Sequence, residues 1–162
     1  MAAVGPPIRA VIGLGNPGER YDRTRHNAGF WFADALIRRY GGVARASRKF
    51  HGEHARLSVD GGDVHVLKPL TYMNHSGRSV RALVDFYRLE PGSLLVVHDE
   101  IDLPPGVVRL KRGGGHGGHN GLRDTVKALD SREFARLRLG VGHPGSADAV
   151  VPYVLARAAR EE

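Results

Sequence analysis

Hydrophobic residues change between two spacings along the chain, and the change predicts strands and helices in turn. Short apolar runs at 8–12 and 94–98 are bounded by glycine or polar residues, which is typical of strands buried on both faces. Between residues 26 and 40, apolar residues recur at helical spacing until two glycines at 41–42 end the run. The chain is therefore predicted to begin with a strand followed by a helix.

The middle of the chain contains a predicted hairpin followed by a second helix. The strand-like segments 53–59 and 63–68 flank an Asp-Gly-Gly turn at 60–62, of a type that joins antiparallel strands. A helix is then predicted to begin at Ser76, because Val80, Leu83, Val84 and Tyr87 share one helical face.

The second half of the sequence predicts four further elements. These are strands at 107–111 and 136–142, a helix over Asn120–Leu129, and a helix over Tyr153–Arg160. Strands that alternate with helices indicate an α/β fold. No repeat, low-complexity tract or linker divides the sequence, so we expect residues 1–162 to form a single domain, with a twisted, mostly parallel (mixed) sheet flanked by helices.

Polar side chains follow the ends of four predicted strands. Asn16 follows the first strand, and the Tyr-Met-Asn segment at 72–74 follows the second strand of the hairpin. Asp99 comes directly after the apolar run 94–98, and His143 follows the last strand. Ligand crevices in open α/β sheets lie outside the carboxyl ends of parallel strands. We therefore expect these four segments to form a site at one edge of the sheet.

Composition narrows the class of protein. The 162 residues include no cysteine, which excludes a disulfide scaffold and thiol catalysis. No run approaches the ~20 apolar residues of a membrane span, and the start lacks the features of a signal peptide. We expect a soluble, cytoplasmic protein with no membrane partner. The 24 Lys and Arg against 17 Asp and Glu give a net charge of +7. This excess favours a nucleic-acid partner, although biased codon usage would produce it too.

The sequence GLGNPG at 13–18 matches the glycine pattern of dinucleotide-binding turns. That pattern requires a helix directly after the third glycine and an acidic residue about 20 positions further on, at the end of the second strand. Here Pro17 and a charged stretch at 19–25 intervene, and Asp34 lies inside the predicted helix. A nucleotide-dependent oxidoreductase is therefore the weaker interpretation. In the stronger one, the segment is a tight turn that directs the amide of Asn16 toward the site.

His26 and Asn27 lie at the start of a predicted helix. Taken by itself, either residue would be interpreted as a helix cap. Asp99 suggests a second role, because a carboxylate that accepts the Nδ1 proton of His26 leaves Nε2 free as a base. Such an imidazole suits deprotonation of water at neutral pH. The sequence has no G-x-S-x-G motif, and Ser76 is better interpreted as a helix cap than as a nucleophile. Direct attack by water is then the simplest hydrolytic mechanism.

The glycine-rich sequence GGGHGGHNG at 113–121 has three interpretations. The first is a metal site, because nitrogen and oxygen ligands suitable for zinc are present: His98, Asp99, His116 and His119. The second is the N-terminus of the helix that begins at Asn120, whose backbone amides would face a ligand. The third is a loop with incidental histidines. Histidines three apart in a flexible loop lack the fixed spacing that a helix provides, so we expect no metal.

Taken in this order, these motifs resemble the bacterial-type peptidyl-tRNA hydrolase family. The similarity is carried by segments 11–34, 68–80, 96–122 and 136–145, which cover most of the chain. It implies an α/β domain that hydrolyses the ester bond between a peptide and the 3′ end of tRNA, which recycles tRNA from prematurely released chains. It also implies tRNA as the partner, a monomer, and catalysis without a metal or cofactor.

The resemblance further implies roles for individual residues. His26 corresponds to the catalytic base, Asp99 to the carboxylate that orients it, and Asn16 to an amide that positions the reacting groups. Substrate-binding roles are implied for Tyr21, Tyr72, Met73, Asn74, His119 and Asn120. Lys111 and Arg138 lie where the family carries cations for a tRNA phosphate.

The sequence departs from the family pattern after residues 143–145, which open a segment that acts as a lid in the family. Members usually continue with a further C-terminal helix, whereas this sequence ends where that helix would start. RNA-binding splicing factors that resemble the family show that the scaffold is reused, so a non-catalytic tRNA- or RNA-binding relative is the alternative function. The sequence contains all the implied catalytic residues and asparagines together: His26, Asp99, Asn16, Asn74 and Asn120. Their joint presence favours the hydrolase over the non-catalytic relative.

Overall fold

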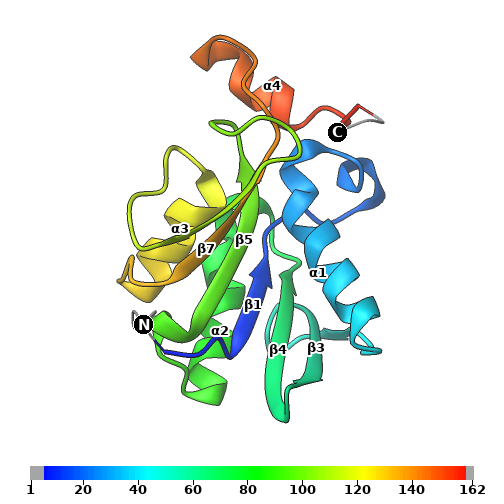
Figure 1. The fold of residues 1–162 in the computed structure, drawn as a ribbon, viewed down its shortest axis with the longest axis vertical. Coiled ribbons are helices and arrows are strands. Elements are labelled where there is room, and N and C mark those ends of the chain that lie inside the picture. Colours follow the sequence, from blue (N-terminus) through cyan, green and yellow to red (C-terminus); the bar gives the residue numbers. More distant parts are fainter. Residues whose placement is uncertain (1–5, 160–162) are drawn as a thin grey trace.

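Seven strands form one mixed sheet, in the spatial order β2-β3-β4-β1-β5-β7-β6, in the computed structural model, which describes residues 6–159 (Figure 1). The strands are β1 (Ala10–Gly13), β2 (Arg45–Ser47), β3 (Gly52–Val59), β4 (Gly62–Pro69), β5 (Leu94–Glu100), β6 (Val108–Arg112) and β7 (Ala135–Gly140). The fold is therefore α/β, as predicted.

Four α-helices accompany the sheet in the described part of the chain: α1 (Ala28–Arg39), α2 (Ser76–Tyr87), α3 (Asn120–Leu129) and α4 (Val150–Val154). Helix α1 packs on one face of the sheet, and α2 and α3 pack together on the other (Figure 1). None of the helices described between residues 6 and 159 is both long and apolar enough to cross a membrane.

Parallel pairing is confined to the four central strands. β4, β1, β5 and β7 are neighbours and run parallel, whereas β2, β3 and β6 add antiparallel pairs at the two edges. The carboxyl ends of the four central strands therefore meet at one edge of the sheet. The sequence predicted this arrangement, because polar segments follow these strands.

The central strands contribute to two apolar layers, because successive side chains of a strand point to opposite faces. Ile12 and Val96 pack with residues of α2 and α3, whereas Val11 and Val97 pack with residues of α1. All four side chains are buried. Burial on both faces explains why these strands appear in the sequence as continuous apolar runs.

A backbone contact brings α1 close to the sheet. A Cβ atom on Gly29 would lie 2.5 Å from backbone atoms of Leu14 and Val97, and one on Gly13 would lie 2.3 Å from the carbonyl oxygen of Gly29. Because nothing separates these backbones, the segment that leads into α1, with His26, lies beside the ends of β1 and β5.

The GLGNPG segment does not form a dinucleotide-binding turn. After Gly18 the chain enters a 3-10 turn at Glu19–Tyr21, and α1 begins only at Ala28. A Cβ atom on Gly15 would lie 2.7 Å from the ring of Phe30. Close packing against Phe30 therefore explains why residue 15 is a glycine. The turn is not followed directly by a helix N-terminus, which a pyrophosphate site would require.

The predicted helix over 153–160 is wrong. Helix α4 spans Val150–Val154, residues 155–159 are not helical, and Arg160 lies outside the described residues. The chain leaves the helix because it pairs with the loop before α1: the amide of Arg25 donates to Ala156, and Thr24 and Arg157 form a β-bridge. A tertiary contact thus overrides the helical pattern. The short, mostly exposed edge strand β2 was not predicted either.

We expect Gly29→Ala to reduce the free energy of unfolding by about 1–3 kcal/mol, because the added methyl group overlaps two backbones. Denaturant unfolding measures this directly. The matched control is Gly62→Ala, where a Cβ atom would meet only the carbonyl of Val59 at 3.8 Å; its change should stay within about 0.5 kcal/mol. Equal stabilities of the two variants would contradict the close packing of α1.

Candidate functional site

A cleft of about 660 Å³ opens at the edge of the sheet where the central strands end. Its lining includes most of the residues that the sequence singled out: Asn16, His26, Tyr72, Met73, Asn74, Asp99, His119 and Asn120. His143, which follows β7, also lines it. All four predicted polar segments therefore reach the same cleft.

Three of the residues singled out lie outside the lining of this cleft. Tyr21 packs edge-on against Tyr72, with ring centroids 6.3 Å apart, so it borders the cleft. Lys111 lies on the exposed edge strand β6. Arg138 lies on β7, where its Nε is 3.0 Å from a carboxylate oxygen of Glu100. The structure thus ties the charge of Arg138 to an acidic residue of the cleft wall.

His26 and Asp99 meet inside the cleft. Nδ1 of His26 lies 2.9 Å from both carboxylate oxygens of Asp99, whose residue is only 3% exposed. The carboxylate accepts the Nδ1 proton, which selects the tautomer in which Nε2 carries the lone pair. This nitrogen has no hydrogen-bond partner among the described residues, so it is available to a water molecule.

Asp99 accepts a second hydrogen bond, from His119. Nε2 of His119 lies 2.8 Å from Oδ1 of Asp99, while Nδ1 of His119 accepts from the backbone amides of Gly121 and Leu122 at 3.1 and 3.2 Å. Because Nδ1 is an acceptor, the proton of neutral His119 is on Nε2 and points to Asp99. His119 therefore caps α3 and donates a hydrogen bond to the buried carboxylate at the same time.

The electrostatics of Asp99 follow from these two contacts. Burial by itself would raise the pKa of the Asp99 carboxyl, but the charges and hydrogen bonds of His26 and His119 outweigh burial and hold this pKa well below its usual range. Asp99 is therefore a carboxylate at any pH near neutrality. Burial and the neighbouring His119 lower the pKa of His98 to about 4. Neutral His98 donates from Nδ1 to the backbone carbonyl of Asp99 at 2.8 Å.

Asn27 fixes the turn that carries Asn16. The side-chain oxygen of Asn27 accepts from the amide of Asn16 at 2.8 Å, and its amide nitrogen donates to the Asn16 carbonyl at 2.9 Å. Asn27 is fully buried and makes no capping bond to α1. From the sequence, only a capping role was predicted for Asn27. Its position directly after His26 is the one signal that could have identified it.

The free donor of Asn16 can be assigned from its other contact. Oδ1 of Asn16 accepts from the amide of Met73 at 2.7 Å, so Nδ2 is the atom left to donate to a ligand in the cleft. Met73 is held in turn by Ser76, whose Oγ donates to the Met73 carbonyl at 2.7 Å. Ser76 was predicted to cap α2. It is instead the first residue of this helix, because His75 occupies the cap position.

Arg136 anchors the glycine-rich loop, which is a role that the sequence did not indicate. This residue is 1% exposed, and its guanidinium donates to the carbonyls of Gly115 and, at 2.8 Å, Gly114. Gly114 has a φ of 95°, a value that other residues rarely adopt. A loop with such freedom needs an external contact to hold it, and Arg136 provides this contact just before His119.

One group of side chains within residues 6–159 places potential metal ligands together: His26, Asp99 and His119, with ligand atoms within 4.8 Å of one another. The same three residues are joined by the hydrogen bonds from His26 and His119 to Asp99. The quartet considered from the sequence is not assembled. His116 lies on the glycine-rich loop, where its Nδ1 accepts from the amide of Gly118.

The wall of the cleft formed by the segment after His143 is apolar. It consists of α4 and its neighbours, and it contributes Ala147, Val150, Val151, Val154 and Leu155. Ile101, which follows β5, adds a further apolar side chain. The cleft therefore has one apolar wall and one wall of amides and imidazoles, with the His26–Asp99 pair between them.

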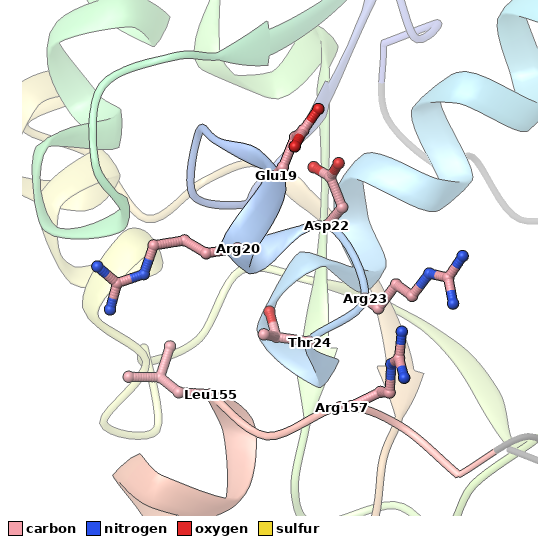
Figure 2. A pocket seen from close by; sticks show the side chains of 7 residues that line it. All are labelled: Glu19, Arg20, Asp22, Arg23, Thr24, Leu155 and Arg157. Atoms are coloured by element: carbon pink, nitrogen blue, oxygen red, sulfur yellow. The ribbon is translucent and has the colours of Figure 1, made fainter.

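A second hollow, of about 480 Å³, lies between the loop before α1 and the segment after α4 (Figure 2). Its lining mixes charges: Arg20, Arg23 and Arg157 with Glu19 and Asp22 (Figure 2). Leu155 lines both this hollow and the cleft. The hollow contains none of the residues singled out as candidates for chemistry.

Together, the fold and the cleft define a class of protein. An α/β sheet presents a histidine, whose Nδ1 is bonded to a buried carboxylate, beside side-chain amides at the carboxyl ends of its strands. Hydrolases that activate a water molecule by general-base catalysis use a histidine and a carboxylate in this way.

Comparison with known proteins gives the family. The profile of the peptidyl-tRNA hydrolase family matches residues 10–162. The chain is 61% identical over 155 residues to a peptidyl-tRNA hydrolase of Halorhodospira halophila, and 58% identical over 157 residues to one of Alkalilimnicola ehrlichii. Each match covers 96% of this chain and 80% of the relative.

Solved structures agree. The crystal structure of the peptidyl-tRNA hydrolase from Acinetobacter baumannii matches with a TM-score of 0.92 at 51% identity, over 95% of this chain and 78% of the other. The chain belongs to the peptidyl-tRNA hydrolase family.

The depressed pKa of Asp99 predicts a dependence of stability on pH. The carboxyl has a pKa of about 3.9 in an unfolded chain and a lower one in the fold. Its contribution is therefore complete above the unfolded value and is lost as pH falls from about 5 toward the folded value. Between pH 7 and pH 2 the free energy of unfolding should fall in both proteins. Because Asn cannot titrate, the fall in Asp99→Asn should be smaller than in the wild type by on the order of 2 kcal/mol. Urea unfolding at both pH values measures the difference; identical losses would contradict it.

Proposed function

We propose that His26 activates the water with which this peptidyl-tRNA hydrolase cleaves the ester bond between peptide and tRNA. The observation that carries the proposal is the bond from Nδ1 of His26 to the buried Asp99 carboxylate, which leaves Nε2 free in the cleft. A water molecule bound to Nε2 attacks the ester carbonyl carbon, and its proton moves to Nε2. Asp99 stabilises the imidazolium that forms. Proton transfer by a positioned base contributes about 10²–10⁴-fold to the rate.

Asn16 supports the same reaction from the other side of the ester. Negative charge develops on the carbonyl oxygen as water attacks, and Nδ2 of Asn16 is the free donor beside the reacting groups. One well-placed donor of this kind is worth roughly 3 kcal/mol in known oxyanion holes. The tetrahedral intermediate then collapses: the bond to the terminal ribose oxygen of tRNA breaks, and that oxygen takes the proton from Nε2.

Asn74 and Asn120 account for selection of a peptide over a free amino acid. Both side chains line the cleft, and neither has a hydrogen bond to another described residue. Their amide donors suit the carbonyl of an N-blocked amino acid. An ammonium group would meet them donor to donor. Unpaired polar groups in a binding site reject the wrong substrate by about 10⁴-fold in favourable cases.

The remaining roles follow the same logic. Tyr21, Tyr72, Met73 and His119 shape the substrate site, and Lys111 and Arg138 contribute charge to tRNA binding. We further propose that the domain acts as a monomer, in the cytoplasm where peptidyl-tRNA arises.

We expect His26→Ala to reduce turnover of N-acetyl-aminoacyl-tRNA at least 100-fold, because the variant has no base at this position. Affinity for tRNA should change little, because an imidazole contributes no phosphate contact. Release of labelled N-acetyl amino acid in the presence of EDTA measures turnover, and a filter-binding assay measures affinity. His54→Ala, which removes a histidine outside the cleft, serves as the control. Equal losses of turnover and affinity in His26→Ala would contradict the role of base.

Asn74→Ala should reduce the preference for N-acetyl-aminoacyl-tRNA over unblocked aminoacyl-tRNA by roughly tenfold or more, because the substrate carbonyl then has one donor fewer. The measurement is the ratio of kcat/KM for the two substrates in the wild type and the variant. An unchanged ratio would exclude Asn74 from substrate selection, even if both rates fell.

A further inference from the structure

The loop before α1 and the segment after α4 are joined by a short antiparallel pairing (Figure 2). Thr24 and Arg157 form the β-bridge, and the amide of Arg25 donates to the carbonyl of Ala156 at 3.1 Å. The next residue of this loop is His26. The backbone that leaves the apolar wall of the cleft is therefore bound to the backbone that leads into the catalytic histidine.

The side chain of Arg25 adds a second attachment, to Tyr153 of α4. Its Nη1 donates to the Tyr153 carbonyl at 3.0 Å, and its Cζ lies 3.9 Å from the centroid of the Tyr153 ring. A guanidinium group can make both contacts at once because it is planar and carries several donors in fixed directions. The ammonium group of a lysine has neither property.

Tyr153 also connects α4 to the sheet. Its hydroxyl group donates to the carbonyl of Val141, which directly follows β7. The fit is close, because a Cβ atom on the next residue, Gly142, would lie 3.0 Å from the Tyr153 hydroxyl oxygen. One side chain thus contacts the end of β7 and the residue before His26.

The contact between Arg25 and Tyr153 lies outside the lining of the cleft. Neither residue lines the cleft, whereas Val150, Val151 and Val154 of the same helix do. Helix α4 therefore presents apolar side chains to the cleft and is attached through Tyr153, which the cleft lining excludes. Because Arg25 is adjacent to His26 in the chain, a displacement of α4 that keeps these bonds also moves the backbone of the base.

We propose that Arg25 is a positioning residue, which holds the apolar wall of α4 at a fixed distance from His26 through its contact with Tyr153. The wall binds the peptide part of the substrate by apolar contact, and the fixed distance aligns the ester carbonyl with the water molecule at Nε2. A misplacement of about 1 Å in such an alignment reduces the rate by up to about 100-fold. This inference rests on the proposed function and adds the residue that aligns the peptide with the base.

The test is a double-mutant cycle on hydrolysis of N-acetyl-aminoacyl-tRNA, with Arg25→Lys, Tyr153→Leu and the two together. Each single variant should lower kcat about tenfold because the alignment is lost. KM should change less than about threefold, because phosphate contacts supply most of the affinity for tRNA. The double variant should be no slower than the slower single variant, because the same contact is lost only once. Tyr153→Phe, which keeps the ring, should retain most of the turnover.

The matched control is Arg23→Lys, the same chemical change two residues earlier in the loop. Arg23 is exposed, and its side chain forms no hydrogen bond or ion pair with a described residue. Its kcat should stay within about twofold of the wild type. Trp31, the only tryptophan of the sequence, reports on the loop without substrate, because its Nε1 donates to the Asp22 carbonyl at 2.7 Å. Quenching of its fluorescence by acrylamide should increase in Arg25→Lys and Tyr153→Leu, but not in Arg23→Lys.

Additive losses in the double variant, a change in KM alone, or an equal loss in Arg23→Lys would overturn the positioning role. If Tyr153→Leu does not fold, as thermal unfolding will show, Tyr153→Phe with Arg25→Lys takes its place in the cycle. The two levels of proposal fail separately. A wild-type protein that does not cleave N-acetyl-aminoacyl-tRNA contradicts the proposed function, and with it the alignment of its substrate. A wild-type protein that cleaves it, together with fully active Arg25→Lys and Tyr153→Leu variants, contradicts only the role of Arg25.

Discussion

The buried carboxylate of Asp99 is the group on which the rest of the site depends. It lies on a central strand, where an unpaired charge would be costly, and it is stabilised there by two imidazole donors. The bonds act in both directions. The carboxylate selects the tautomer of His26 and gives the Nε2–H of His119 a partner, while the two histidines keep Asp99 ionised. Loss of any one member therefore changes the state of the other two.

Three separate contacts bring these groups together, and each lies outside the reacting atoms. The approach of Gly29 to β1 and β5 places the start of α1, with His26, beside the strand ends. The bonds from Asn27 fix the turn of Asn16. Arg136 holds the glycine-rich loop that leads to His119. Backbone contact, buried amide bonds and a buried guanidinium serve the same purpose, which is to remove the freedom that the loops at the strand ends would otherwise have.

The cleft is asymmetric in a way that matches its substrate. A peptidyl-tRNA molecule is a polyanion on one side of the ester and a chain of variable, uncharged amides on the other. The apolar wall of α4 suits a peptide of any sequence, because apolar contact requires no particular partner. The amide side chains of the opposite wall are the groups proposed to bind the part of the substrate that all peptidyl-tRNAs share.

Local patterns in the chain were enough to predict the α/β class, the central strands and the meeting of their polar ends. Strand burial and helical periodicity are properties of short segments, and parallel topology then places Asn16, Asp99 and His143 at one edge. Features that depend on distant partners could be seen only in the folded protein. Helix α4 ends early because residues near Arg157 pair with the loop before α1, and Arg136 is buried because a glycine loop folds over it. His119 could be identified as a cleft residue from its motif, but its bond to Asp99 required the fold. Hydrogen bonds between segments far apart in sequence leave no periodic signal, so only the folded chain reveals them.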